Sequence, residues 1–101
     1  MNPYNKEEVI DGKRYSTKTA TLLAGNDYWD GHNWERSGTN DFLYRTPRGR
    51  YFLFCLTQWQ GDHDRIEPIE NEANARELFE SFREKRVSYE EAFPKFTVEE
   101  A

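Results

Sequence analysis

The residues with the most obvious chemical potential are one cysteine, Cys55, and two histidines, His32 and His63. A cysteine beside a histidine can form a nucleophile–base pair. Cys55, however, stands inside the apolar run 52–56, where a cysteine is usually a small buried hydrophobe. An active thiolate needs partial exposure and a positive neighbour. We therefore predict that Cys55 is buried and that its thiol is unreactive, and we assign no catalytic residue.

The turn Asp62-His63-Asp64 offers one imidazole and two carboxylates, which together with His32 could hold a divalent ion or serve a small enzyme. A structural zinc site usually has four Cys or His ligands at short paired spacings, and this sequence has no such spacing. Glycosidase-type catalysis needs two carboxylates across a cleft with separated pKa values, and an acidic chain supplies carboxylate pairs by chance. We expect no metal and no cofactor, and we keep an enzyme built on this turn as an alternative.

Two basic segments interrupt an otherwise acidic chain of 101 residues with a net charge of -5. Their cations and the interleaved tyrosines are Lys13, Arg14, Tyr15 and Lys18 in one, and Tyr44, Arg45, Arg48, Arg50 and Tyr51 in the other. Cations that contact phosphates, beside rings that stack on bases, bind single-stranded nucleic acid. The net negative charge opposes such binding, and basic residues also protect exposed strand edges. Direct nucleic-acid binding is therefore an alternative function rather than the main one.

The segment 25–40 is the most informative stretch, because a structureless connection of this length is unusual in a small domain and is often functional. It is rich in Gly, Asn, Asp and Trp. Exposed Trp and Tyr residues anchor interfaces, although they can also fold back and roof the core. We predict a protein-binding surface formed by Tyr28, Trp29, Asp30, His32, Trp34 and Glu35. Its acidic residues, and those of 70–101, would attract a basic or nucleic-acid-associated partner.

The elements that must position these residues can be read from turn signals and from apolar spacing. Asp11-Gly12 indicates a small hairpin over 9–15, and 19–24 favours a strand. A second hairpin over 41–59 turns at Pro47 to Arg50, and its near-continuous apolar return strand predicts a central position. Residues 66–69 read as a short edge strand because they contain a proline.

Helical signals follow from Asn71 onward. The apolar stripe of Ala75, Leu78, Phe79 and Phe82 predicts a helix that runs to about Lys85. Ser88-Tyr89-Glu90-Glu91 is a capping box for a second short helix, which Pro94 ends. The predicted core is Leu22, Phe42, Tyr44, Phe52, Phe54, Ile66, Leu78, Phe79 and Phe82. We predict one α+β domain over 1–101, loose at 1–8, with an antiparallel sheet of about four strands and a C-terminal helix packed on one face.

Two segments carry a family resemblance: GKRYSTKTA at 12–20 and LYRTPRGRYFL at 43–53. They resemble the motifs GK-x-Y-x-T-x-TA and LYRT-x-x-G-x-YFL of a family of small uncharacterised bacterial proteins, often carried on plasmids and phages. An acidic helix led by a proline follows in that family, similar to 68–82 here, and then a short acidic tail similar to 92–101. This chain differs from the commonest members at 55–64, where many have a Gly-rich loop. The mobile-element setting implies an inhibitor of host defence, for example an anti-CRISPR-like protein.

The function predicted from the sequence is a small non-catalytic protein-binding module with a regulatory or inhibitory role. No basic start is followed by an apolar run, so we expect no signal peptide. The longest apolar-rich run, 51–56, is far too short to span a bilayer, and a single cysteine permits no intramolecular disulfide. We therefore expect a cytoplasmic protein whose partner is another protein and not a membrane.

Overall fold

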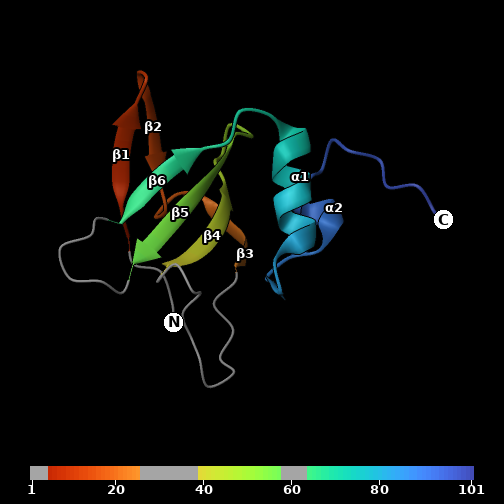
Figure 1. The fold of residues 1–101 in the computed structure, drawn as a ribbon. Coiled ribbons are helices and arrows are strands. Elements are labelled where there is room, and N and C mark those ends of the chain that lie inside the picture. Colours follow the sequence, from red (N-terminus) through yellow and green to blue (C-terminus); the bar gives the residue numbers. More distant parts are fainter. Residues whose placement is uncertain (1–4, 26–38, 58–63) are drawn as a thin grey trace.

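The structure is a computed structural model that describes residues 5–25, 39–57 and 64–101 (Figure 1). The strands form a two-stranded antiparallel sheet and a five-stranded antiparallel sheet in the order β6-β5-β4-β3-β7. Their bounds are β1 (Glu7–Ile10), β2 (Lys13–Ser16), β3 (Thr21–Gly25), β4 (Thr39–Arg45), β5 (Tyr51–Thr57), β6 (Arg65–Pro68) and β7 (Glu84–Lys85). The predicted α+β class is confirmed, while the main sheet has five strands instead of about four.

Both predicted hairpins form, and glycines make their turns possible. Asp11 and Gly12 have φ values of 54° and 76°, the left-handed pair that joins strands through a tight turn. The β4–β5 turn contains Gly49 with φ 85°. It is closed by a bond of 2.7 Å from the backbone N–H of Thr46 to the carbonyl oxygen of Arg50. These two turns fix the positions of the basic residues that flank them.

The five-stranded sheet has an apolar core on each of its two faces. β5 lies between β6 and β4, so the prediction of a central strand covered on both faces is confirmed. The helix-side core consists of Leu23, Ala24, Leu43, Tyr51, Ala75, Phe79, Phe82, Ala92 and Phe93. The hairpin-side core consists of Tyr15, Phe42, Tyr44, Phe52, Phe54, Leu56 and Ile66. Tyr15 brings the β1–β2 hairpin onto the sheet through an edge contact with Phe52, at 5.5 Å between ring centroids.

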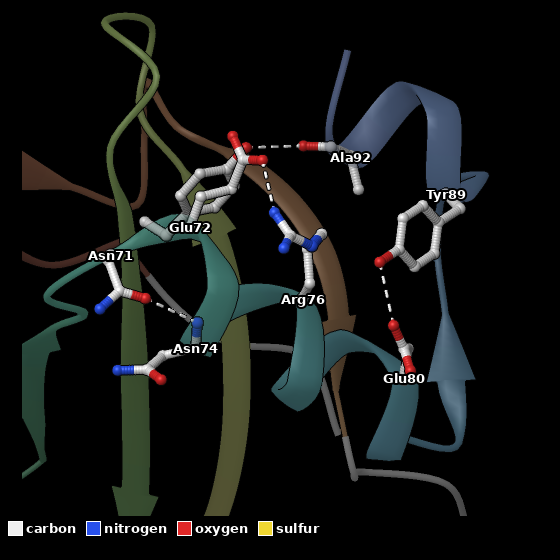
Figure 2. A network of polar contacts seen from close by, with 8 residues as sticks. Asn71, Glu72, Asn74, Arg76, Glu80, Tyr89 and Ala92 are labelled. Atoms are coloured by element: carbon white, nitrogen blue, oxygen red, sulfur yellow. Dashed lines mark hydrogen bonds and ion pairs between the residues drawn. The ribbon is translucent and has the colours of Figure 1, made fainter. Parts of the chain in front are cut away.

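The first helix, α1 (Glu72–Ser81), begins one residue after the predicted Asn71, which is its N-cap. The side-chain oxygen of Asn71 accepts from the backbone N–H of Asn74 at 2.9 Å (Figure 2). The helix ends about four residues earlier than predicted, because Phe82 turns to an extended conformation with φ -78° and ψ 141°. The residues beyond it form β7, which pairs with the far end of β3.

The second helix, α2 (Tyr89–Ala92), is capped by Ser88 as predicted. The Ser88 hydroxyl accepts from the backbone N–H of Glu91 at 3.1 Å. α1 and α2 lie on the same side of the sheet (Figure 1). Across the described ranges, neither helix is long and apolar enough to cross a membrane.

The predicted core residues are buried except Leu22 and Leu78, which are half-buried. The prediction missed Leu23 and Phe93, both of which are completely buried. A register shift between Leu22 and Ala24 places Leu23 and Ala24 together in the helix-side core. Such a bulge breaks the alternation of side chains on which a pattern-based assignment depends.

Candidate binding surface

The contact surface predicted in the long connection cannot be located in the fold. Its residues, Tyr28, Trp29, Asp30, His32, Trp34 and Glu35, lie outside the described residues. Asp62 and His63 of the proposed enzyme turn also lie outside them, while Asp64 is half-buried just before β6. Among the residues that the structure describes, no three His, Cys, Asp or Glu side chains come together as a metal site. Both predictions for these segments stay predictions.

Cys55 is buried, as predicted, with 2% of its surface exposed. It lies on β5 opposite Asp41 of β4. Burial, followed by the nearby Asp41 carboxylate, raises the pKa of the Cys55 thiol to about 12. The thiolate that nucleophilic chemistry requires is therefore disfavoured at neutral pH.

The described surface feature that stands out lies where the two basic hairpins meet. A groove of about 610 Å³ runs between the β1–β2 hairpin and the β4–β5 turn. Lys13 and Arg14 line one side, and Arg48 and Arg50 line the other. Tyr15 and Pro47 also line it, so aliphatic and ring surface is present beside the charges. The two basic segments, separate in the sequence, thus form one site.

A second hollow, of about 300 Å³, adjoins the other side of the same turn. Arg48 lines both hollows, and Lys95, in the segment after α2, lines the second one. Together the two hollows bring five cations around the turn, and one glutamate lines each hollow, Glu7 in the first and Glu72 in the second. We call this group of cations the basic strip and define it by Lys13, Arg14, Arg48, Arg50 and Lys95. Lys95 was not among the predicted basic residues, and only the docking of the chain after α2 brings it here.

The charges of the basic strip are largely uncompensated. In the described part of the chain, the side chains of Lys13, Arg48, Arg50 and Lys95 have no ion pair or hydrogen bond. Arg14 lies 3.5 Å from a Glu7 carboxylate oxygen, with both side chains exposed. An exposed pair of this kind contributes at most about 1 kcal/mol and is weakened by salt. The strip therefore presents positive charge to the solvent.

Arg45 belongs to the same predicted basic set but has a different role. Its guanidinium donates to the carbonyl oxygens of Glu91 and Ala92, the latter at 3.0 Å. These carbonyls lie at the end of α2, where backbone acceptors have no partner within the helix. Arg45 therefore stabilises the docking of α2. Lys18, the remaining predicted cation, is exposed and does not line the strip.

The three tyrosines expected to stack on bases are part of the core, which corrects that expectation. Tyr15, Tyr44 and Tyr51 expose 6%, 4% and 6% of their surfaces. Tyr44 is stacked on Phe52 at 5.2 Å between centroids. The Tyr51 hydroxyl donates to the carbonyl oxygen of Ala92 at 3.0 Å. Rings held in this way do not present a face to a nucleobase.

Two carboxylates of the acidic helical layer have partners within that layer. Glu72 accepts from Arg76 at 2.8 Å, one helical turn away, and Glu80 accepts from the Tyr89 hydroxyl at 2.9 Å (Figure 2). These two carboxylates are engaged within the fold. The other carboxylates of 70–101, such as Glu77 and Glu90, have no such partner among the described residues, so the prediction that this acidic face docks a basic partner stays a prediction.

Comparison with protein-family models, with curated proteins and with solved structures finds no match to this chain. What the strip can bind is consequently decided by the chemistry of its own residues. Guanidinium and ammonium groups recognise carboxylates and phosphates, and they supply no nucleophile or general base at neutral pH.

Proposed function

We propose that the protein is a non-catalytic protein-binding module, with a regulatory or inhibitory role, that takes an acidic segment of its partner along the basic strip. One observation carries the proposal. Four cations that have no partner among the described residues converge on one turn, although the chain as a whole has a net charge of -5. Like charges held together repel one another, so the isolated fold gains nothing from this arrangement. A partner of opposite charge converts that repulsion into attraction.

An acidic protein segment suits the strip better than a nucleic acid does. The tyrosines beside the cations are buried, so stacking cannot support nucleic-acid binding there. The overall negative charge repels a continuous phosphate backbone more than it repels a peptide with a few carboxylates. Pro47 and the aliphatic stems of the arginines also offer apolar contact to the side chains that separate those carboxylates.

The narrower expectation, an anti-CRISPR-like inhibitor of a nucleic-acid-binding host system, comes from the family resemblance. We retain it as part of the proposal, with the partner's acidic segment as the element recognised. The segment Tyr28 to Glu35 remains a candidate for a second contact, in which its aromatic residues would add apolar area to the charged contact of the strip.

The proposal is tested with two labelled probes, a peptide of about ten glutamates and a thymidine oligonucleotide of equal length, followed by fluorescence anisotropy at low salt. The test variant is Arg48→Gln with Arg50→Gln. The control is Arg65→Gln with Arg83→Gln, which changes the net charge equally at two exposed positions away from the β4–β5 turn. Arg65 lies in an exposed ion pair with Glu67.

We expect the strip variant to bind the glutamate peptide about tenfold more weakly and the control to bind it within about twofold of the wild type. Equal losses in both variants would mean that the probe senses only net charge, which contradicts a specific site. Tighter binding of the oligonucleotide than of the peptide, lost in the strip variant alone, would replace the proposal with the nucleic-acid alternative.

A further inference from the structure

The segment after α2 begins inside the basic strip and then leaves the body of the protein. Pro94 and Lys95 line the smaller hollow together with Arg48. Residues 94–101 are exposed throughout, and the chain runs outward from there to its last residue (Figure 1). The exit of this tail is therefore placed directly beside the cations proposed to bind a partner.

Phe96 fixes the start of the tail. The Arg76 guanidinium lies 4.0 Å from the centroid of its ring, and the Tyr89 ring lies 6.1 Å away. The backbone N–H of Phe96 also donates to the carbonyl oxygen of Phe93 at 3.0 Å. No comparable contact holds residues 97–101 among those that the structure describes. The tail is thus tethered at Phe96 and unconstrained beyond it.

The unconstrained part of the tail carries carboxylates, the groups that the cations of the basic strip bind. Glu99 and Glu100 are adjacent carboxylates, exposed and without a partner in the described ranges, and Val98 is a large apolar side chain with 40% of its surface exposed. Glu100 is the fourth residue after Phe96. An extended chain covers roughly 3.3–3.6 Å per residue, so these carboxylates can travel about 14 Å from the anchor. Arg48 shares a hollow with Lys95, the residue that precedes this anchor.

We propose that the acidic tail, residues 97–100, folds back over the basic strip and competes with an acidic partner for it. This inference rests on the proposed function, because it names the strip's own intramolecular occupant. A short flexible tether gives an effective concentration in the millimolar range. Even a tail contact with a dissociation constant of about 1 mM would then occupy the strip for much of the time, and an external ligand would bind correspondingly more weakly.

The test compares two charge-matched variants. Glu99→Gln with Glu100→Gln removes the tail's carboxylates, while Glu77→Gln with Glu84→Gln removes two exposed carboxylates from α1 and β7. With the glutamate peptide as probe, we expect the tail variant to bind about three- to tenfold more tightly than the wild type. The control should stay within about twofold. Adding Arg48→Gln and Arg50→Gln to the tail variant should abolish its advantage.

A second readout needs no ligand and separates this inference from the proposed function. The backbone amide resonances of Gly49 and Arg50 should shift in the tail variant and not in the control, because only the tail variant loses an occupant of the strip. Unchanged resonances together with equal peptide affinities would overturn the inference while leaving the proposed function standing. Shifted resonances without peptide binding would support the tail contact and contradict the function. Shifts that grow with protein concentration would assign the contact to the tail of a second copy and overturn the intramolecular form.

Discussion

The helical layer and the basic strip use the same kinds of side chain in opposite ways. In the helical layer Arg76 bonds Glu72 and covers the Phe96 ring, and Lys85 donates to the carbonyl oxygen of Phe82 at 2.6 Å. In the strip, Arg48 and Arg50 have no partner among the described residues. The difference shows that a cation stabilises the fold where a carboxylate, a ring or a helix-end carbonyl lies within its reach, and that it remains available where none does.

Arg45 and Arg48 show the contrast within a single hairpin. Arg45 ends β4 and faces the end of α2, where unpaired carbonyl groups carry a partial negative charge. Arg48 lies three residues later in the turn, is exposed, and has no hydrogen bond to those carbonyls. The following predictions test this difference between cations that stabilise the fold and cations that remain available, beginning with the largest effect.

Removing the ring that joins the helical layer to the sheet should have the largest effect on stability. Phe93 is fully buried and lies 5.2 Å from Tyr51 and 5.6 Å from Phe79, measured between centroids. Phe93→Ala should lower the free energy of unfolding by ~3–5 kcal/mol, measured by urea denaturation. Phe96→Ala, at a more exposed ring, is the control and should cost much less. A loss below about 1 kcal/mol for Phe93→Ala would mean that α2 does not hold the helical core closed.

The arginine comparison is tested directly by matched substitutions in the hairpin. Arg45→Ala leaves the carbonyl oxygen of Glu91 without its charged donor and leaves that of Ala92 with only the Tyr51 hydroxyl, so it should lower the free energy of unfolding by about 1.5–3 kcal/mol. Arg48→Ala should change it by less than about 0.5 kcal/mol, because that side chain has no ion pair or hydrogen bond in the described ranges. Equal losses of unfolding free energy at the two positions would contradict the proposal that Arg45 stabilises the fold while Arg48 does not.

A smaller effect is expected from the hydroxyl that reinforces the same helix end. Tyr51→Phe keeps the buried ring but removes the donor to the carbonyl oxygen of Ala92. Because Arg45 still donates to that oxygen, we expect a loss of only about 0.5–1.5 kcal/mol in the free energy of unfolding. The loss should become larger in an Arg45→Ala background, since the carbonyl would then have neither donor.

The smallest effect at neutral pH concerns Cys55, whose thiol pKa is raised to about 12 by burial. Native protein at pH 8 should therefore react with a thiol reagent far more slowly than protein in urea. The raised pKa also determines whether stability rises or falls with pH in alkaline solution. Between the ordinary thiol pKa of 9.0 and about 12, the unfolded chain loses a proton that the folded chain keeps, so stability falls as pH rises. Cys55→Ala should flatten part of that fall, and an unchanged slope would count against a buried thiol.

Local signals in the sequence determined the hairpins and the helix starts. Asp11-Gly12 and Gly49 need a left-handed backbone, and Ser88 satisfies a helix N–H with its own side chain, so neighbouring residues suffice to predict them. The helix end near Ser81 and the strand β7 were missed. Both depend on pairing with β3, which is distant in the chain. Local helical spacing therefore overestimated α1.

The sequence by itself also determined that positive charge gathers in two segments of an acidic chain, and that Cys55 lies among apolar neighbours. Only the tertiary structure decided which cations meet. Strand pairing and the docking of α2 bring Lys13, Arg48 and Lys95 around one turn, and the same docking commits Arg45 to the fold. It also buried the three tyrosines that the pattern offered for stacking. The physical reason is that exposure and partnership depend on contacts between distant segments, which no spacing along the chain records.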